Sequence, residues 1–262
     1  MKALVFAAGI GSRLRPYTDK HTKALVDVGG KPMLRNVIDR LTAAGVDDIT
    51  VNVHHFAGQI KDYLSSVKSE IPAEIHISDE SECLLDTGGG ILRARKYLDS
   101  IKTDEPFIVH NADILSTVDL QEMITHHTDT GADATLLVCD RDTSRKLAFD
   151  HSGRMHGWMN LGTGEIKAGP SVENPGDITK MHMLAFGGIH ILTPKVFPLL
   201  EKFAHTAGDK FSIIPFYINC TDLLDIRAYC PARDSYSWYD IGKPETLEKA
   251  RQWLAARNIH FL

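Results

Sequence analysis

Short apolar segments alternate with segments of helical period through the first half of the chain, and this alternation most constrains its fold. Residues 3–7 form an unbroken apolar run, which is typical of a strand buried on both faces of a parallel sheet. Further strands are expected at 47–55, 73–78 and 106–113, and helices at 32–45, 57–67, 89–98 and 120–131. Strands separated by helices of this length predict right-handed crossovers and helices on both faces of a mostly parallel sheet.

The pattern changes after residue 133. Strands are expected at 132–140, 181–192, 223–229 and 234–241, with a hairpin at 147–159 and helices at 194–203, 211–220 and 244–257. We therefore predict an α/β protein of three α/β/α layers, Rossmann-like, with a mixed, mostly parallel sheet. A small β-rich region should begin near residue 140. Because no repeat or low-complexity linker divides the sequence, a single domain over 1–262 is expected.

The composition narrows the classes of function. The 262 residues carry a formal net charge of −5, with both signs interspersed, which disfavours a general nucleic-acid surface. The cysteines Cys83, Cys139, Cys220 and Cys230 form no C-x-x-C pair, so scattered reduced thiols are expected rather than a metal or disulfide framework. The sequence holds no signal peptide and no apolar stretch long enough for a bilayer, so we expect a cytoplasmic protein with no membrane partner.

The first strand runs into a glycine loop that is the most informative local feature. Its residues are Ala7, Ala8, Gly9, Gly11 and Arg13, and Lys23 follows. A dinucleotide loop requires G-x-G-x-x-G, but Leu14 stands at the third position; the G-x-x-x-x-G-K-[ST] loop is absent too. Glycines let backbone N–H groups approach an anion, and fixed cations neutralise it. The loop therefore favours a nucleoside triphosphate.

Motifs along nearly the whole chain resemble those of the sugar-1-phosphate nucleotidyltransferases. Residues 7–18 are similar to the pattern A-A-G-x-G-x-R-x-x-P-x-T, and 22–25 to P-K-P-L, although both prolines are replaced and only Lys23 is kept. Later matches are Thr87-Gly88-Gly89-Gly90, Asn111-Ala112-Asp113, Phe186-Gly187-Gly188-Ile189 and the segment Trp238-Tyr239-Asp240-Ile241-Gly242-Lys243-Pro244. They occur in the order that the family has.

This resemblance implies a reaction and a set of site residues. A sugar-1-phosphate oxygen would attack the α-phosphorus of an NTP in line, and pyrophosphate would leave. Arg13 would neutralise the leaving phosphates, and Lys23 the α-phosphate or the sugar phosphate. Asp113 and Asp240, each expected at the carboxyl end of a strand, would hold Mg²⁺. Residues 1–135 would bind the nucleotide and residues 136–262 the sugar phosphate, closed by the last helix.

The remaining expected site residues follow from weaker matches. Asp86 should lie near the edge of the base, and Gly88 should let the base stack on the backbone. The sugar phosphate should meet Asn111, Glu173, Lys180 and Gly188. The family's E-K-P lysine is replaced here by Asn174, and Lys180 or Lys210 are the candidates to substitute for it.

Several alternatives remain open from the sequence. The resemblance implies first an enzyme like the mannose-1-phosphate guanylyltransferases, and the alternatives are a MurNAc-1-phosphate uridylyltransferase or another sugar- or heptose-phosphate nucleotidyltransferase, so GTP or UTP is the expected donor. A non-catalytic regulator that binds sugar nucleotides is a more remote alternative. Such a protein would be expected to have lost at least one charged site residue, but the sequence keeps Arg13, Lys23, Asp113 and Asp240. The apolar face of the closing segment is compatible with a homo-oligomer.

Overall fold

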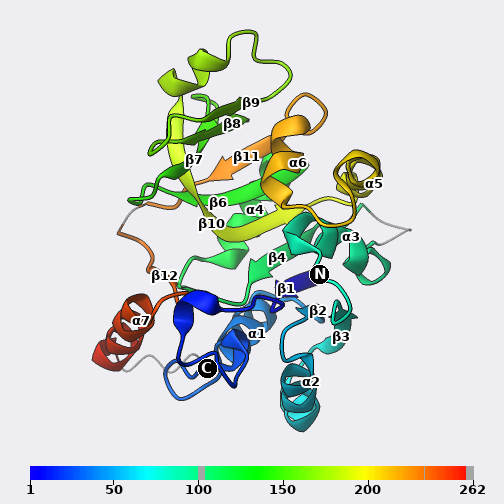
Figure 1. Ribbon diagram of the computed structural model, residues 1–262, viewed down its shortest axis with the longest axis vertical. Coiled ribbons are helices and arrows are strands. Elements are labelled where there is room, and N and C mark those ends of the chain that lie inside the picture. The colour runs from blue at the N-terminus through cyan, green and yellow to red at the C-terminus, as the bar shows by residue number, and fades with distance from the viewer. Residues whose placement is uncertain (100–103, 233, 258–262) are drawn as a thin grey trace.

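The computed structural model describes residues 1–99, 104–232 and 234–257 (Figure 1). The strands are β1 (Lys2–Phe6), β2 (Asp48–Val53), β3 (Glu74–Asp79), β4 (Phe107–Asn111), β5 (Ile114–Ser116), β6 (Ala134–Cys139), β7 (Arg145–Phe149), β8 (Met155–Asn160), β9 (Ile166–Ala168), β10 (His182–Leu192), β11 (Ile226–Tyr229) and β12 (Trp238–Asp240). The α-helices are α1 (Met33–Ala43), α2 (Ala57–Ser66), α3 (Asp86–Leu98), α4 (Leu120–Thr130), α5 (Val196–Ala207), α6 (Ile213–Asn219) and α7 (Pro244–Arg257).

The first four long strands form the predicted parallel sheet. The order β3–β2–β1–β4 is parallel throughout, with Lys2 opposite both Asp48 and Phe107. Strand β10 then pairs antiparallel with β4, while β6 and β11 pair parallel with each other. The carboxyl ends of β1 and β4 therefore lie side by side, which brings the glycine loop next to the residues that follow Asn111.

Helices cover both faces of this sheet, as the alternation predicts. In β1, Ala3 and Val5 belong to one apolar core, while Leu4 belongs to the other. The first core is closed by α1, α2, α4 and α7, and the second by α3, α5 and α6. Helix α1 illustrates the cause, because Leu34, Val37, Ile38 and Leu41 all lie on one face and are fully buried. Burial of such a side chain contributes about 1.5–3 kcal/mol. The three-layer α/β fold is confirmed.

The β-rich region expected near residue 140 is built on one long strand. The start of β10 pairs with β7, and β8 and β9 extend that antiparallel sheet, which lies far from α2 and α7 (Figure 1). Farther along, β10 pairs with β6, and the register shifts between Phe186 and His190. The sequence did not predict β5 or β9, because three residues are too few to establish a period of two. The strand expected over 234–241 covers only Trp238–Asp240.

A two-stranded ladder connects two distant parts of the chain. Strands β5 and β12 pair antiparallel with Asp240 opposite Ile114, and the Ile241 N–H donates to the Asp113 carbonyl over 3.0 Å. The main chain thus fixes Asp113 and Asp240 beside each other. No helix in the described part of the chain is both long and apolar enough to cross a bilayer.

Candidate active site

The glycine loop after β1 folds back on itself and places Lys23. Gly11 has φ +69°, a left-handed conformation that favours glycine, and its carbonyl accepts from Thr18 Oγ1 over 2.8 Å. A Cβ atom at Gly11 would lie 2.9 Å from Thr18 Cγ2 and 3.2 Å from Lys23 Cβ. The glycine is therefore needed both for the turn and for the close approach of the segment that carries Lys23.

Four charged residues from four parts of the chain meet beside this loop. Lys23 Nζ lies 2.5 Å from Asp113 Oδ2 and 3.8 Å from Asp240 Oδ1, and Arg13 Nη2 lies 3.9 Å from Asp240 Oδ2. The Lys23 side chain is only 10% exposed, whereas that of Arg13 is 60% exposed. Because both carboxylates face one ammonium, they converge on a point where positive charge is stabilised. The structure brings together all four residues that the sequence predicted as catalytic.

Gly242 borders this cluster. A Cβ atom there would lie 2.7 Å from Asp240 Oδ1, 2.9 Å from Arg13 Nη2 and 3.1 Å from Lys23 Nζ. Its N–H donates to Asp240 Oδ1 over 2.8 Å and so orients that carboxylate. The missing side chain leaves the space in which three charged groups meet.

The donor set suits a hard divalent cation held partly by substrate. Asp113 and Asp240 are 30% and 34% exposed, so each carboxylate keeps an open side. Within the described residues, no group of three or more His, Cys, Asp or Glu side chains could complete a metal site. Mg²⁺ is bound in proteins by one or two carboxylates, with waters and phosphate oxygens as the other ligands. The pair of carboxylates fits that ion.

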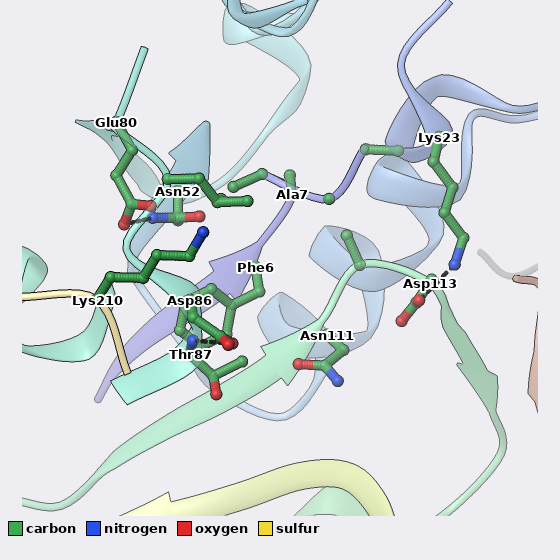
Figure 2. A pocket seen from close by; sticks show the side chains of 15 residues that line it. Phe6, Ala7, Lys23, Asn52, Glu80, Asp86, Thr87, Asn111, Asp113 and Lys210 are labelled. Atoms are coloured by element: carbon green, nitrogen blue, oxygen red, sulfur yellow. Dashed lines mark hydrogen bonds and ion pairs between the residues drawn. The ribbon is translucent and has the colours of Figure 1, made fainter. Parts of the chain in front are cut away.

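A cavity of about 420 Å³ extends from the charged cluster across the carboxyl ends of the strands (Figure 2). Its lining residues are Phe6, Ala7, Ala8, Gly9, Lys23, Ala24, Asn52, Glu80, Leu84, Asp86, Thr87, Asn111, Ala112, Asp113 and Lys210. Lys23 and Asp113 lie at one end, and Asn52, Glu80 and Lys210 lie at the other (Figure 2). Ligands bind at this edge in open α/β sheets, and the size suits a nucleotide.

The far end of the cavity holds polar residues that the sequence did not single out. Asn52 lies near the end of β2, and its amide Nδ2 donates to Glu80 Oε1. Glu80 also accepts from the Leu85 N–H over 2.9 Å, and burial raises the pKa of its carboxyl above the usual 4.5. Only 3% of Glu80 is exposed, and none of Asn52. An Asn near the end of an apolar strand carries no motif, so only the fold could place it here.

The two residues expected near the base differ in their placement. Asp86 lines the cavity and is exposed, with φ +61°, and its carboxylate accepts from the Thr87 N–H over 2.6 Å. Gly88 is buried outside the lining, where its N–H donates to the Phe211 carbonyl over 2.9 Å. A Cβ atom there would lie 2.3 Å from the Phe211 ring. This glycine permits α3 to pack on Phe211, and the stacking of a base on its backbone stays a prediction.

The residues expected at the sugar phosphate separate into two groups. Asn111 lines the cavity. Gly188 packs against Asn111, since a Cβ atom at Gly188 would lie 3.0 Å from Asn111 Nδ2. Glu173 and Lys180 are exposed and do not line the cavity. Lys180 Nζ is paired with Asp177 Oδ1 at 2.8 Å. Of the two lysines considered for the missing family lysine, only Lys210 lines the cavity.

Comparison with known proteins agrees with this geometry. Residues 2–257 match the nucleotidyl transferase family. N-acetylmuramate alpha-1-phosphate uridylyltransferase of Caulobacter vibrioides is 30% identical over 97% of this chain and 96% of its own length. Mannose-1-phosphate guanylyltransferase 1 of Arabidopsis thaliana is 32% identical over 70% of this chain, and the match spans 52% of that protein, about half its length.

Solved structures share the fold over nearly the full chain. A putative glucose-1-phosphate thymidylyltransferase from Bacillus anthracis superposes with a TM-score of 0.80 at 19% identity, covering 100% of this chain and 97% of that one. HddC from Yersinia pseudotuberculosis, complexed with GMP-PN, superposes with a TM-score of 0.71 at 24% identity. The match covers 97% of this chain and 99% of that one. The family match confirms the resemblance of the sequence motifs, and the chain belongs to the nucleotidyl transferase family.

Proposed function

We propose that this protein transfers a nucleotidyl group from an NTP to a sugar-1-phosphate and releases pyrophosphate. The observation that carries the proposal is the nearly buried Lys23 ammonium, which is held between Asp113 and Asp240 at one end of a cavity that the glycine loop also lines. Positioning and neutralisation of charge are the main demands of phosphoryl transfer, and this cluster supplies both.

Each residue has a distinct part in the proposed reaction. The glycine loop would hold the phosphates with its backbone N–H groups, and the exposed Arg13 would neutralise the β- and γ-phosphates. Lys23 would hold the α-phosphate while a sugar-phosphate oxygen forms the new P–O bond and the bond to the β-phosphate oxygen breaks. The attacking oxygen is already anionic at neutral pH, so no side chain has to remove a proton.

The proposal includes Mg²⁺ as a cofactor. Asp113 and Asp240 would hold the ion, which neutralises phosphate charge when it is bound. Lys23 and Arg13 would then exchange these carboxylates for phosphate oxygens as partners. We also expect a cytoplasmic protein without nucleic-acid or membrane partners. Three further expectations stay predictions: a homo-oligomer, a single domain over 1–262, and its division into a nucleotide-binding half (1–135) and a sugar-phosphate-binding half (136–262).

The substrates proposed follow the sequence motifs and the relatives. GTP with mannose-1-phosphate is the first candidate, and UTP with MurNAc-1-phosphate is the second. A specific observation supports keeping the second candidate, because the Caulobacter uridylyltransferase aligns along 96% of its length, whereas the plant guanylyltransferase aligns along 52% of its length.

The test is release of pyrophosphate from four NTPs, each paired with several sugar-1-phosphates, with and without Mg²⁺. We expect release that requires both substrates and stops on chelation by EDTA. A complete lack of release with every pair would refute the enzyme and leave the sugar-nucleotide regulator, which should still bind an NDP-sugar. Release without any sugar phosphate would indicate hydrolysis instead of transfer.

A further inference from the structure

The end of the cavity opposite Lys23 and Asp113 contains a hydrogen-bond acceptor that lacks a donor among the described residues. Asn52 is fully buried and lines the cavity, and no donor among the described residues reaches its Oδ1. A buried polar atom without a partner costs about 1–3 kcal/mol, so such atoms at a cavity indicate a group that a ligand satisfies. The donor that Oδ1 lacks would therefore come from the molecule that fills the cavity.

Neighbouring groups fix which end of the Asn52 amide faces the cavity. Both Glu80 oxygens accept hydrogen bonds, Oε1 from Asn52 Nδ2 and Oε2 from the Leu85 N–H at 2.9 Å. A carboxylate can only accept, so the NH₂ group of Asn52 must point at Glu80 and its oxygen must point away. Glu80 thus acts as a positioning residue that keeps an acceptor turned toward the ligand.

A donor lines the same end of the cavity as this acceptor. Lys210 lines the same end of the cavity, and its ammonium is directed toward the part of the cavity that Asn52 borders (Figure 2). An ammonium offers only donors. The two side chains together present one acceptor and one donor at the end opposite the Lys23–Asp113 pair.

We propose that Asn52 and Lys210 select a base with a keto–imino edge, which guanine and uracil share. In guanine the N1–H lies beside the O6 carbonyl, and in uracil the N3–H lies beside O4, so the ring N–H would donate to Asn52 Oδ1 while the carbonyl accepts from Lys210. Adenine and cytosine have the reverse order, an acceptor nitrogen beside an amino group, and would leave both protein groups unpaired. This inference rests on the proposed nucleotide site and adds the residues that would select the base.

Glu80→Gln offers a sharp test because it should reverse the Asn52 amide. The Leu85 N–H requires an acceptor, so the oxygen of the new amide would face Leu85 and its NH₂ group would face Asn52. Asn52 would then turn its own oxygen toward that NH₂ group and its own NH₂ toward the cavity. We measure binding of GTP, UTP, ATP and CTP by titration calorimetry with Mg²⁺ and no sugar phosphate. The wild type should bind GTP or UTP about a hundred-fold more tightly than ATP and CTP.

The expected result for Glu80→Gln is that this preference falls below about tenfold. Asn52→Leu should weaken GTP and UTP without improving ATP or CTP, because it removes the acceptor and adds no donor. Asp79→Asn is the matched control: Asp79 is a neighbouring carboxylate that pairs with Lys61 at 2.5 Å and lies outside the cavity lining, so the preference should stay. Melting curves establish that each variant is folded.

Three results would overturn the inference: a wild type that binds ATP or CTP as well as GTP and UTP, an unchanged preference in folded Glu80→Gln, or full affinity for both 1-methyl-GTP and 3-methyl-UTP, which lack the ring proton. Relative affinity of GTP and UTP then identifies the base. If ATP were the only NTP to release pyrophosphate with a sugar phosphate, the base selection would be refuted and the proposed transferase would stand. Selective binding of GTP or UTP without pyrophosphate release would refute the transferase and support the base selection.

Discussion

Gly242→Ala should impair the reaction while leaving the fold intact. The added methyl group would lie 2.7 Å from Asp240 Oδ1, 2.9 Å from Arg13 Nη2 and 3.1 Å from Lys23 Nζ, where ordinary contacts begin near 3.4 Å. The three polar atoms must therefore retreat by about 0.3 to 0.7 Å. All three are ends of flexible side chains, and the φ angle of Gly242 is not in the left-handed region, so alanine fits the backbone.

A shift of this size has a calculable effect on the rate. Misplacement of a reacting group by about 1 Å costs about a hundred-fold, so displacements of half that size predict a loss of roughly tenfold in kcat/KM. That loss corresponds to about 1.4 kcal/mol of transition-state stabilisation. The melting temperature should change by only a few degrees.

The assay is pyrophosphate release at varied NTP and sugar-phosphate concentrations, with thermal unfolding measured alongside. Gly58→Ala is the matched control, because a Cβ atom at Gly58 in α2 would meet nothing within 4 Å. It should leave kcat/KM unchanged and stabilise the helix by about 0.5–1 kcal/mol. Wild-type kcat/KM in Gly242→Ala would refute the reasoning, because the charged groups could then not act at the point where they converge.

Three further predictions test the site and the fold. Asp113→Asn should abolish turnover with little change in melting temperature, and near wild-type turnover would remove Asp113 from the metal site. Gly88→Ala should lower the free energy of unfolding in urea by about 1–3 kcal/mol, because its Cβ would overlap the Phe211 ring at 2.3 Å; wild-type stability would contradict that packing. Burial lowers the pKa of His110 and His127 from 6.5 to about 4, so the unfolded chain binds more protons than the folded one between these pH values. The free energy of unfolding should therefore fall as pH decreases from about 6.5 to about 4. A urea midpoint that does not change with pH over this range would refute the prediction.

The sequence predicted the charged half of the site because each residue there stands at a position with a local signal. Arg13 and Lys23 follow a glycine loop, and Asp113 and Asp240 follow apolar segments. The carboxyl ends of neighbouring strands meet in space whatever lies between them along the chain, so strand ends could be combined without knowledge of the loops.

Two residues at the other end of the cavity could not be predicted in this way. Asn52 and Glu80 matter through a contact between two strand ends, and neither belongs to a motif. The role of Gly88 is hard to predict for a related reason, since a triple glycine can permit either a ligand or a neighbouring segment of the chain to approach. Which of these applies depends on Phe211, more than a hundred residues away in the sequence.

The β5–β12 ladder has a consequence for the order in which the site is completed during synthesis. The glycine loop, Lys23 and Asp113 all belong to the first half of the chain, but Asp240 arrives with one of the last strands. A nascent chain could form the parallel sheet and a nucleotide cavity while its second carboxylate is still missing. Competence for transfer would then begin only when β12 pairs with β5, so an incomplete chain could hold a nucleotide without consuming it.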